Sequence, residues 1–268
     1  MTAASLPMYD LAAVCQATNK WWEGLARAFR LQGVPDVPDD LSRGSGVSDL
    51  WTSKDLIFSQ TCGYPLINSL KEHVRLVAAP CYDAPGCSGS DYCSVIIVPI
   101  KLDVGSLKDL KGCICAVNSR DSHSGCNILR YMLAPIVQGE AFFESVKISG
   151  HHRESLLMLA RGEADIAAID CVTFALITRY EPYIIEDLRV LCYSPPAPCL
   201  PYITSVRSPD DVVQKLRAGL EAAFRDRSLE DCREALMLSG VRTVPLSEYE
   251  RIAKYEAQAI AMGYRDLQ

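Results

Sequence analysis

The chain has 268 residues, of which 49% are hydrophobic and 22% charged, and its formal net charge is −6 at pH 7. This composition is typical of a globular protein with one or two domains. The negative charge argues against general nucleic-acid binding, and no apolar run reaches the roughly 18 residues that would predict a membrane span. We therefore expect no nucleic-acid partner and no membrane insertion.

The predicted elements alternate between strands and helices along the chain. Short apolar runs indicate strands at residues 3–9, 55–59, 74–79, 92–98, 112–117, 146–149, 164–170, 188–193 and 202–206. Apolar residues at helical spacing predict helices at residues 11–32, 66–72, 126–134, 153–161, 171–179, 210–226, 229–238 and 247–262. The segment 34–49 is rich in Pro, Asp, Ser and Gly, so we expect it to be mostly loop. The alternation predicts an α/β fold with largely parallel sheets.

A loop rich in small polar residues joins the strand at 112–117 to the helix at 126–134, and it reads Asn-Ser-Arg-Asp-Ser-His-Ser-Gly. The first turn of a helix has N–H groups without intrahelical partners and a positive dipole end, which favour an anion. Ser122 and Ser124 would add hydroxyl donors, and Gly125 would let a ligand approach the backbone. The alternative is that one of these serines only caps the helix, and for this stretch alone capping is the better interpretation.

Polar residues follow several of the predicted strands at the points where these strands end. They are Tyr9, residues 60–64, Tyr82, residues 118–125, His151 and Asp170. In open α/β sheets, ligands bind beyond the carboxyl ends of the strands, so these loops indicate one binding cleft. Asp170 has an alternative role as the cap of the helix at 171–179.

Five of these segments, taken in order, resemble the phosphate and phosphonate substrate-binding proteins of ABC transporters. The segments are residues 60–65, 84–92, 122–125, 150–151 and 164–170, and the resemblance runs from about residue 6 to 204. It implies a two-lobe type II periplasmic-binding-protein-like fold, in which two crossover strands form a hinge that closes on a ligand. The lobes would be residues 1–97 plus 194–268 and residues 98–193, with the crossover strands at 95–99 and 191–196.

The resemblance also implies a set of ligand-binding residues in a cleft between the lobes. The anion would lie on Ser122, Ser124 and the N–H groups of His123, Gly125 and Cys126. His151 rather than His152 would contact the ligand. Asp121 departs from the pattern, because its carboxylate would lie near the anion. The full set is Tyr9, Gln60, Thr61, Tyr64, Tyr82, Asn118, Ser122, His123, Ser124, Gly125, His151 and Asp170.

Binding of a small phosphate- or phosphonate-like oxyanion without catalysis is the function that we infer, in a transporter-type binding protein or solute sensor. The alternative is a cytosolic biosynthetic enzyme on the same fold. No nucleophile–base pair or metal cluster is visible in the sequence, and we expect neither a cofactor nor a metal. We expect a monomer whose partners are the ligand and, in a transporter, its membrane component.

The N-terminus and the cysteines bear on the compartment. Residues 1–10 lack the basic region and apolar core of a secretory signal, which favours the cytoplasm, or the periplasm if a leader has been removed. Of the twelve cysteines, Cys81, Cys87 and Cys93 are evenly spaced around a loop. A disulfide could form there, but reduced thiols are the simpler interpretation.

Overall fold

The structure is a computed structural model, and it describes residues 2–44, 46–137 and 141–268. The chain divides into two compact units. Unit 1 comprises Met1–Asp83, Ser88–Ser90 and Pro198–Glu248, and unit 2 comprises Ala84–Cys87, Asp91–Ala197 and Tyr249–Gln268.

Unit 1 is built on a five-stranded mixed sheet with the strand order β1-β2-β11-β3-β12. Strand β11 runs antiparallel to both β2 and β3, and β12 runs antiparallel to β3. The strands are β1 (Ala3–Ala4), β2 (Leu56–Gln60), β3 (Val74–Tyr82), β11 (Tyr202–Ser205) and β12 (Leu238–Arg242). The helices are η1 (Ala12–Val14), α1 (Cys15–Leu31), α2 (Val47–Trp51), α3 (Gly63–Asn68), α7 (Asp210–Arg225), η5 (Arg227–Leu229) and α8 (Glu230–Ala235).

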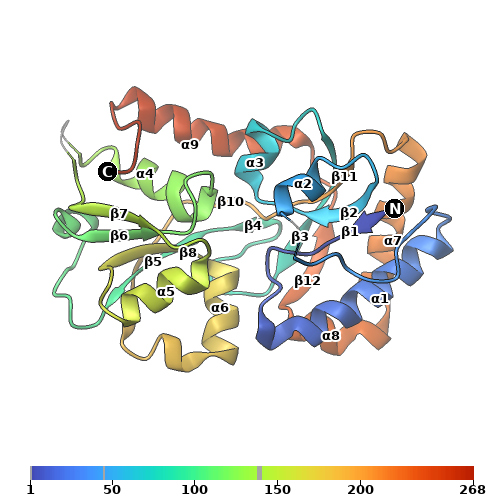
Figure 1. Ribbon diagram of the computed structural model, residues 1–268, viewed down its shortest axis with the longest axis horizontal. Helices are drawn as coiled ribbons and strands as arrows, with labels where there is room; N and C mark the ends of the chain where they lie inside the picture. The colour runs from blue at the N-terminus through green and yellow to red at the C-terminus, as the bar shows by residue number, and fades with distance from the viewer. Residues whose placement is uncertain (1, 45, 138–140) are drawn as a thin grey trace. The chain divides into compact units, whose positions relative to one another are not determined.

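The core of unit 1 is aromatic, and it lies between α1 and the sheet. Trp22 stacks on Phe58 with ring centroids 6.3 Å apart, and Phe29 lies 5.0 Å from the same ring. Helix α7 packs closely against α1, because a Cβ on Gly219 would lie 2.5 Å from a ring carbon of Phe29. Figure 1 shows α1 and α8 side by side in this unit.

Unit 2 is built on a second five-stranded mixed sheet, with the order β7-β6-β8-β5-β9. Strand β6 runs parallel to β7 and β8, whereas β5 runs antiparallel to β8 and β9. The strands are β5 (Ser94–Pro99), β6 (Ile114–Val117), β7 (Ser145–Ile148), β8 (Ile166–Asp170) and β9 (Leu188–Tyr193), and the short β4 (Asp91–Tyr92) pairs with β10 (Ala197–Pro198). The helices are η2 (Leu107–Leu110), η3 (His123–Asn127), α4 (Ile128–Leu133), α5 (His152–Ala160), α6 (Cys171–Tyr180), η4 (Pro182–Ile184) and α9 (Glu250–Ala261), and η6 (Leu246–Tyr249) precedes α9.

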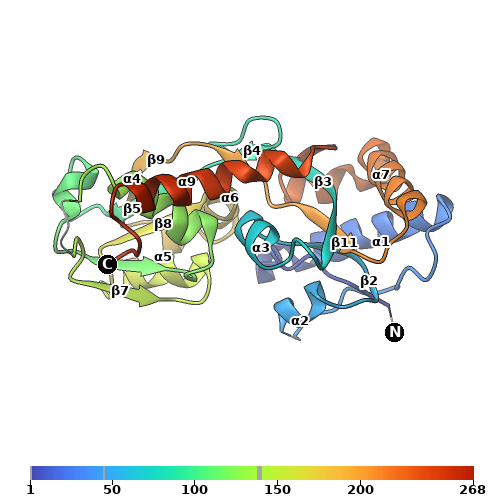
Figure 2. The same ribbon diagram turned by 90° about the horizontal axis from the view of Figure 1, so that it is seen from above.

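The C-terminal helix α9 lies along α4, as both Figure 1 and Figure 2 show. Ala259 and the following Tyr264 and Leu267 are buried in the same apolar core as β6 and α4. Arg130 of α4 donates to the carboxylate of Glu256 at 3.0 Å and to the carbonyl of Arg265 at 2.5 Å. These contacts place the C-terminal segment in unit 2.

The lobe boundaries expected from the sequence need correction at the crossover strands and at the C-terminal segment. The expected crossover strands at 95–99 and 191–196 fall on β5 and β9, which pair with each other inside the sheet of unit 2. The segment 249–268, expected in lobe one, belongs to unit 2, because its apolar residues are buried against α4. The alternation of predicted strands and helices does not show which distant segments pack together.

The local predictions differ from the structure at several places. The sheets are mixed rather than largely parallel, because β11 in unit 1 and β5 in unit 2 each run antiparallel to both of their neighbours. Helix α2 lies in the expected loop at 34–49, β3 extends through Pro80 to Tyr82, and β12 follows α8 where no strand was expected. The strand expected at residues 3–9 is only Ala3–Ala4, since 3-10 helix η1 follows closely.

Candidate functional site

The helix after β6 starts three residues earlier than the sequence predicts, with the π-helical turn η3 running into α4. Ser122 is the residue before this turn, and its hydroxyl oxygen accepts a hydrogen bond from the Gly125 N–H at 3.1 Å. Both Ser122 and Ser124 are buried. Ser122 therefore caps the helix, which is the alternative that the sequence left open.

Ser124 contacts a histidine rather than the backbone. Its hydroxyl lies 2.8 Å from Nε2 of His152, the first residue of α5. Burial lowers the pKa of His152 to about 3, and the neighbouring His151 adds to this effect. The His152 ring is therefore neutral at pH 7, although part of the residue remains exposed.

Ser94 of β5 fixes the position of the Ser124 backbone. The Ser94 hydroxyl donates to the carbonyl of Ser124 at 2.9 Å, and the Ser94 N–H donates to the Ser194 hydroxyl at 2.8 Å. Ser94 is buried and is the first residue of an apolar strand, so its sequence context gave no sign of this role. The start of helix η3 is thus held by a strand that is distant in the sequence.

Gly125 is required at its position by Asn118 in this structure. A Cβ at residue 125 would lie 1.8 Å from Oδ1 of Asn118 and 3.2 Å from Cε1 of His152. The Asn118 Oδ1 atom is buried without a hydrogen-bond partner among the described residues. The sequence predicted that Gly125 makes room for a ligand, whereas here it makes room for the Asn118 side chain.

His123 directs its ring away from the polar loop. The ring stacks on Tyr255 of α9 with centroids 5.8 Å apart, and its Nδ1 atom lies 3.1 Å from Nδ2 of Asn127. Burial lowers the pKa of His123 to about 3. Only the backbone N–H of His123 is therefore placed to meet an anion at the helix start.

His151 and Asp170 both act as helix caps. His151 is exposed, and its Nδ1 atom accepts from the Glu154 N–H at the start of α5. Asp170 is buried at the end of β8, and one carboxylate oxygen accepts from the N–H groups of Val172 and Thr173 at 2.8 and 3.0 Å. The histidine that contacts the serine loop is His152, and the expected contact of His151 with the ligand stays a prediction.

The remaining candidates lie in unit 1. Gln60 donates from Nε2 to the Tyr82 hydroxyl and to the Leu200 carbonyl, both at 3.0 Å, and the rings of Tyr9 and Tyr82 meet edge to face at 5.2 Å. They line a cavity of about 30 Å³ together with Leu6, Thr18, Trp21, Leu236 and Leu238. A volume of this size accommodates about one or two water molecules.

Thr61 and Tyr64 follow the end of β2. Thr61 is fully buried, and its backbone N–H donates to the Pro201 carbonyl at 3.1 Å. Tyr64 is half-buried in the first turn of α3. The polar residues at strand ends thus separate into two sets, one in each unit.

Two features are absent from the described residues, which omit 1, 45 and 138–140. No group of three or more His, Cys, Asp or Glu side chains is arranged to bind a metal ion. No helix in the same residues has the length and apolar character needed to cross a membrane.

Comparison with known families and structures gives a consistent result. The family model described as the periplasmic substrate-binding protein of phosphonate ABC transporters matches residues 53–249. A comparison with curated proteins gives no significant match.

Several solved structures are similar over nearly the whole chain. A binding protein component of a phosphonate ABC transporter from Pseudomonas aeruginosa has a TM-score of 0.78 at 16% identity, covering 98% of this chain and 87% of that one. PhnD1 from Prochlorococcus marinus, solved with methylphosphonate, has a TM-score of 0.77 at 14% identity, covering 96% and 97%. A Xanthomonas citri protein bound to ATP has a TM-score of 0.72 at 14% identity, covering 98% of each chain. At these identities the likeness shows a common fold, which is the two-lobe periplasmic-binding-protein-like fold.

Proposed function

The chain belongs to the family of periplasmic substrate-binding proteins of phosphonate ABC transporters, and we propose that its oxyanion site lies at the start of helix η3. The observation that supports this site is the group of Ser122, Ser124 and His152, which is formed within unit 2. Neutral donors at a helix start suit an anion, because the backbone N–H groups and the dipole already favour negative charge there.

The tautomer of His152 decides what Ser124 can offer to a ligand. A neutral imidazole has one N–H and one acceptor nitrogen. If Nε2 carries the proton, the ring donates to the Ser124 oxygen, and the serine O–H is then left to donate to the oxyanion. We propose that the ligand-bound protein uses this Nε2–H tautomer, so His152 is a positioning residue for Ser124.

Phosphonates and phosphate esters are the ligand class that we propose. Several donors converge at this helix start, and a tetrahedral oxyanion has three oxygens that can accept from different directions. A structure of PhnD1 from Prochlorococcus marinus contains methylphosphonate, which makes that compound a suitable first probe. Tyr9, Gln60, Thr61, Tyr64 and Tyr82 of unit 1 remain proposed ligand contacts.

Replacing Ser124 by Ala separates ligand binding from capping. A hydrogen bond to a charged group contributes about 1.5–3 kcal/mol, so Ser124→Ala should weaken methylphosphonate binding roughly tenfold or more. Isothermal titration calorimetry measures this change. Ser145→Ala is the matched control, because Ser145 is an exposed serine of β7 in the same unit. Unchanged affinity in Ser124→Ala would place the anion elsewhere.

The same titrations, carried out with three ligands, also measure ligand specificity. The parent protein should bind methylphosphonate and phosphate more tightly than acetate, since a planar carboxylate has only two oxygens. Ser124→Ala should reduce affinity for the tetrahedral oxyanions more than for acetate. An equal loss for all three ligands would point to general misfolding, which a urea melt of the same variant checks.

We propose binding without chemical turnover. Ser124 and His152 have the spacing of a nucleophile and a general base, so an enzyme on this fold is the competing function. A general base works best when its pKa lies near the working pH, and the pKa of His152 near 3 makes it a weak proton acceptor. The pair therefore suits a fixed hydrogen bond rather than proton transfer.

The family description bears on the partner and on the compartment. The partner that we propose, besides the ligand, is the membrane component of an ABC transporter, with the protein acting as a monomer. The family is periplasmic by its description. The cytoplasmic location inferred from the first ten residues stays a prediction, which cell fractionation would check.

A further inference from the structure

Three cysteines from two distant parts of the sequence, residues 87–93 and residue 171, meet at the start of helix α6 in unit 2. The Sγ atoms of Cys87 and Cys171 lie 3.5 Å apart. The N–H of Cys171 donates to the carbonyl of Cys93 at 3.1 Å, and the Cys93 thiol hydrogen-bonds to that of Cys171. All three carry thiols in the structure, so this cluster is reduced.

Gly86 explains how the sulfurs come so close. A Cβ at residue 86 would lie 2.5 Å from Sγ of Cys93, 3.5 Å from Sγ of Cys171 and 3.3 Å from Cβ of Cys171. The backbone before Cys87 therefore runs directly over the Cys171 side chain. Gly86 also has a φ of +97°, a conformation that other residues rarely adopt.

The chemistry of the three thiols differs. Hydrogen bonds from the Cys87 and Cys93 thiols lower the pKa of Cys171, and they outweigh its burial. The contact with Cys171, together with burial, raises the pKa of Cys93. Cys171 and Cys93 are buried, whereas Cys87 is half-buried and therefore open to a reagent from solution.

We propose that Cys87 and Cys171 form a thiol–disulfide exchange site that reacts with small disulfides. The Cys87 thiol loses its proton and attacks one sulfur of the small disulfide, which releases one thiolate and leaves a mixed disulfide on Cys87. The Cys171 thiol also loses its proton, and the resulting thiolate attacks the Cys87 sulfur and releases the second small thiolate. The protein loses two protons and two electrons, and the small disulfide is reduced to two thiols.

The geometry favours Cys87 over Cys93 as the partner of Cys171. Closing a disulfide requires the two sulfurs to move from 3.5 Å to about 2.05 Å, which side-chain rotation at a half-buried residue supplies. Cys93 lies in the short link between β4 and β5, where its backbone is held by the bond from Cys171. Cys93 therefore keeps its thiol in this reaction.

Peptide mapping tests the pairing directly. The reduced, folded full-length protein is incubated with oxidised glutathione, then denatured, alkylated with N-ethylmaleimide and cleaved before aspartates without reductant. This cleavage places Cys87, Cys93 and Cys171 on separate peptides, residues 83–90, 91–102 and 170–186. We expect peptide 83–90 linked to peptide 170–186, and two alkylated thiols fewer than the twelve of the reduced protein.

Variants provide the controls. Cys192→Ser, at a half-buried cysteine of β9 in the same unit, should leave the link unchanged. Cys87→Ser should abolish it, with Cys171 recovered as a thiol or as a glutathione adduct. The proposal is overturned if Cys87 and Cys171 are not linked in the parent protein at equilibrium, or if peptide 91–102 takes the place of peptide 83–90. The parent map needs no variant to fold.

Discussion

His123 and His152 are the residues through which pH should act on the stability of unit 2. Burial lowers both pKa values to about 3, whereas an unfolded histidine has a pKa of about 6.5. Between these values the unfolded state binds more protons, so the free energy of unfolding falls as the pH drops below 6.5. Each histidine should cost roughly 2 kcal/mol between pH 7 and pH 5. Urea melts of the parent protein at both pH values measure this loss.

Substitution tests whether the loss belongs to these two rings. His123→Gln should reduce the loss between pH 7 and pH 5 by about half, because one of the two buried histidines is gone. His73→Gln, at an exposed histidine, should leave the loss as it is in the parent. An unchanged pH dependence in His123→Gln would mean that this ring is charged in the folded protein.

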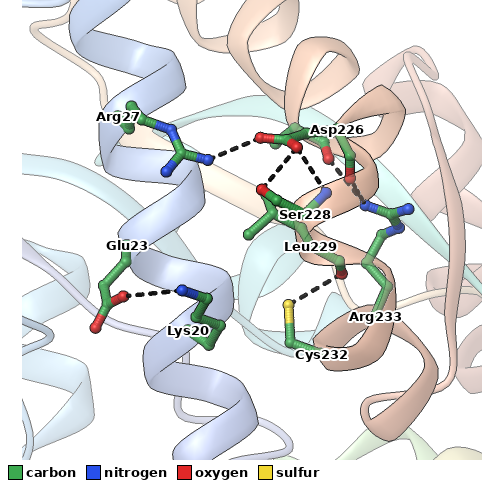
Figure 3. Close-up of polar contacts among 9 residues, drawn as sticks. Lys20, Glu23, Arg27, Asp226, Ser228, Leu229, Cys232 and Arg233 are labelled. Atoms are coloured by element: carbon green, nitrogen blue, oxygen red, sulfur yellow. Dashed lines mark hydrogen bonds and ion pairs between the residues drawn. The ribbon is translucent and has the colours of Figure 1, made fainter.

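At the scale of elements, Asp226 organises the junction between α7 and η5 against α1 (Figure 3). Its carboxylate accepts from the Ser228 N–H at 2.8 Å, from the Ser228 hydroxyl at 2.7 Å and from Arg27 of α1 at 2.7 Å. Its carbonyl accepts from Arg233 at 2.8 Å. Losing the cap in Asp226→Ala should lower the free energy of unfolding by about 1 kcal/mol in a urea melt.

Two further variants separate the cap from the ion pair. Asp39→Ala removes another carboxylate that pairs with an arginine of α1 but caps no helix, so it should cost less than about 0.5 kcal/mol. Asp226→Asn keeps an oxygen that can accept from Ser228 and should retain most of the stability. If Asn proves as costly as Ala, the pair with Arg27 is the main contribution.

For the whole molecule, ligand should stabilise unit 2 more than unit 1. All three tryptophans lie in unit 1, so their fluorescence follows that unit alone. Methylphosphonate at a hundred times its Kd should add about 2.7 kcal/mol and raise a melting transition by several degrees. If the units melt separately in calorimetry, the transition that is silent in tryptophan fluorescence should rise.

Melts of the variants and a check of the ligand after incubation test the alternatives to this prediction. The rise should be smaller in Ser124→Ala and unchanged in Ser145→Ala. A rise confined to the fluorescence transition would place the ligand in unit 1 instead. Phosphorus NMR after prolonged incubation should recover methylphosphonate unchanged, and a new phosphorus signal would establish turnover.

The α/β class, the family and the segment that forms the start of helix η3 could all be predicted from the sequence. These follow from local information: apolar periodicity, small polar residues after a strand, and five short segments in a fixed order. Ser122 caps the helix, which is one of the two roles that the sequence indicated for it.

Only the tertiary structure decided which distant residues meet. His151 and His152 are adjacent in the sequence, but His151 caps α5 whereas His152 contacts Ser124. No local sequence pattern predicts which of the two histidines takes which role. Cys87 and Cys171 are 84 residues apart in the chain, and the last helix joins unit 2 because α4 buries its apolar residues. Such contacts depend on how the helices and strands pack against one another. The free energy of packing depends on both segments in contact, so neither segment's sequence alone predicts it.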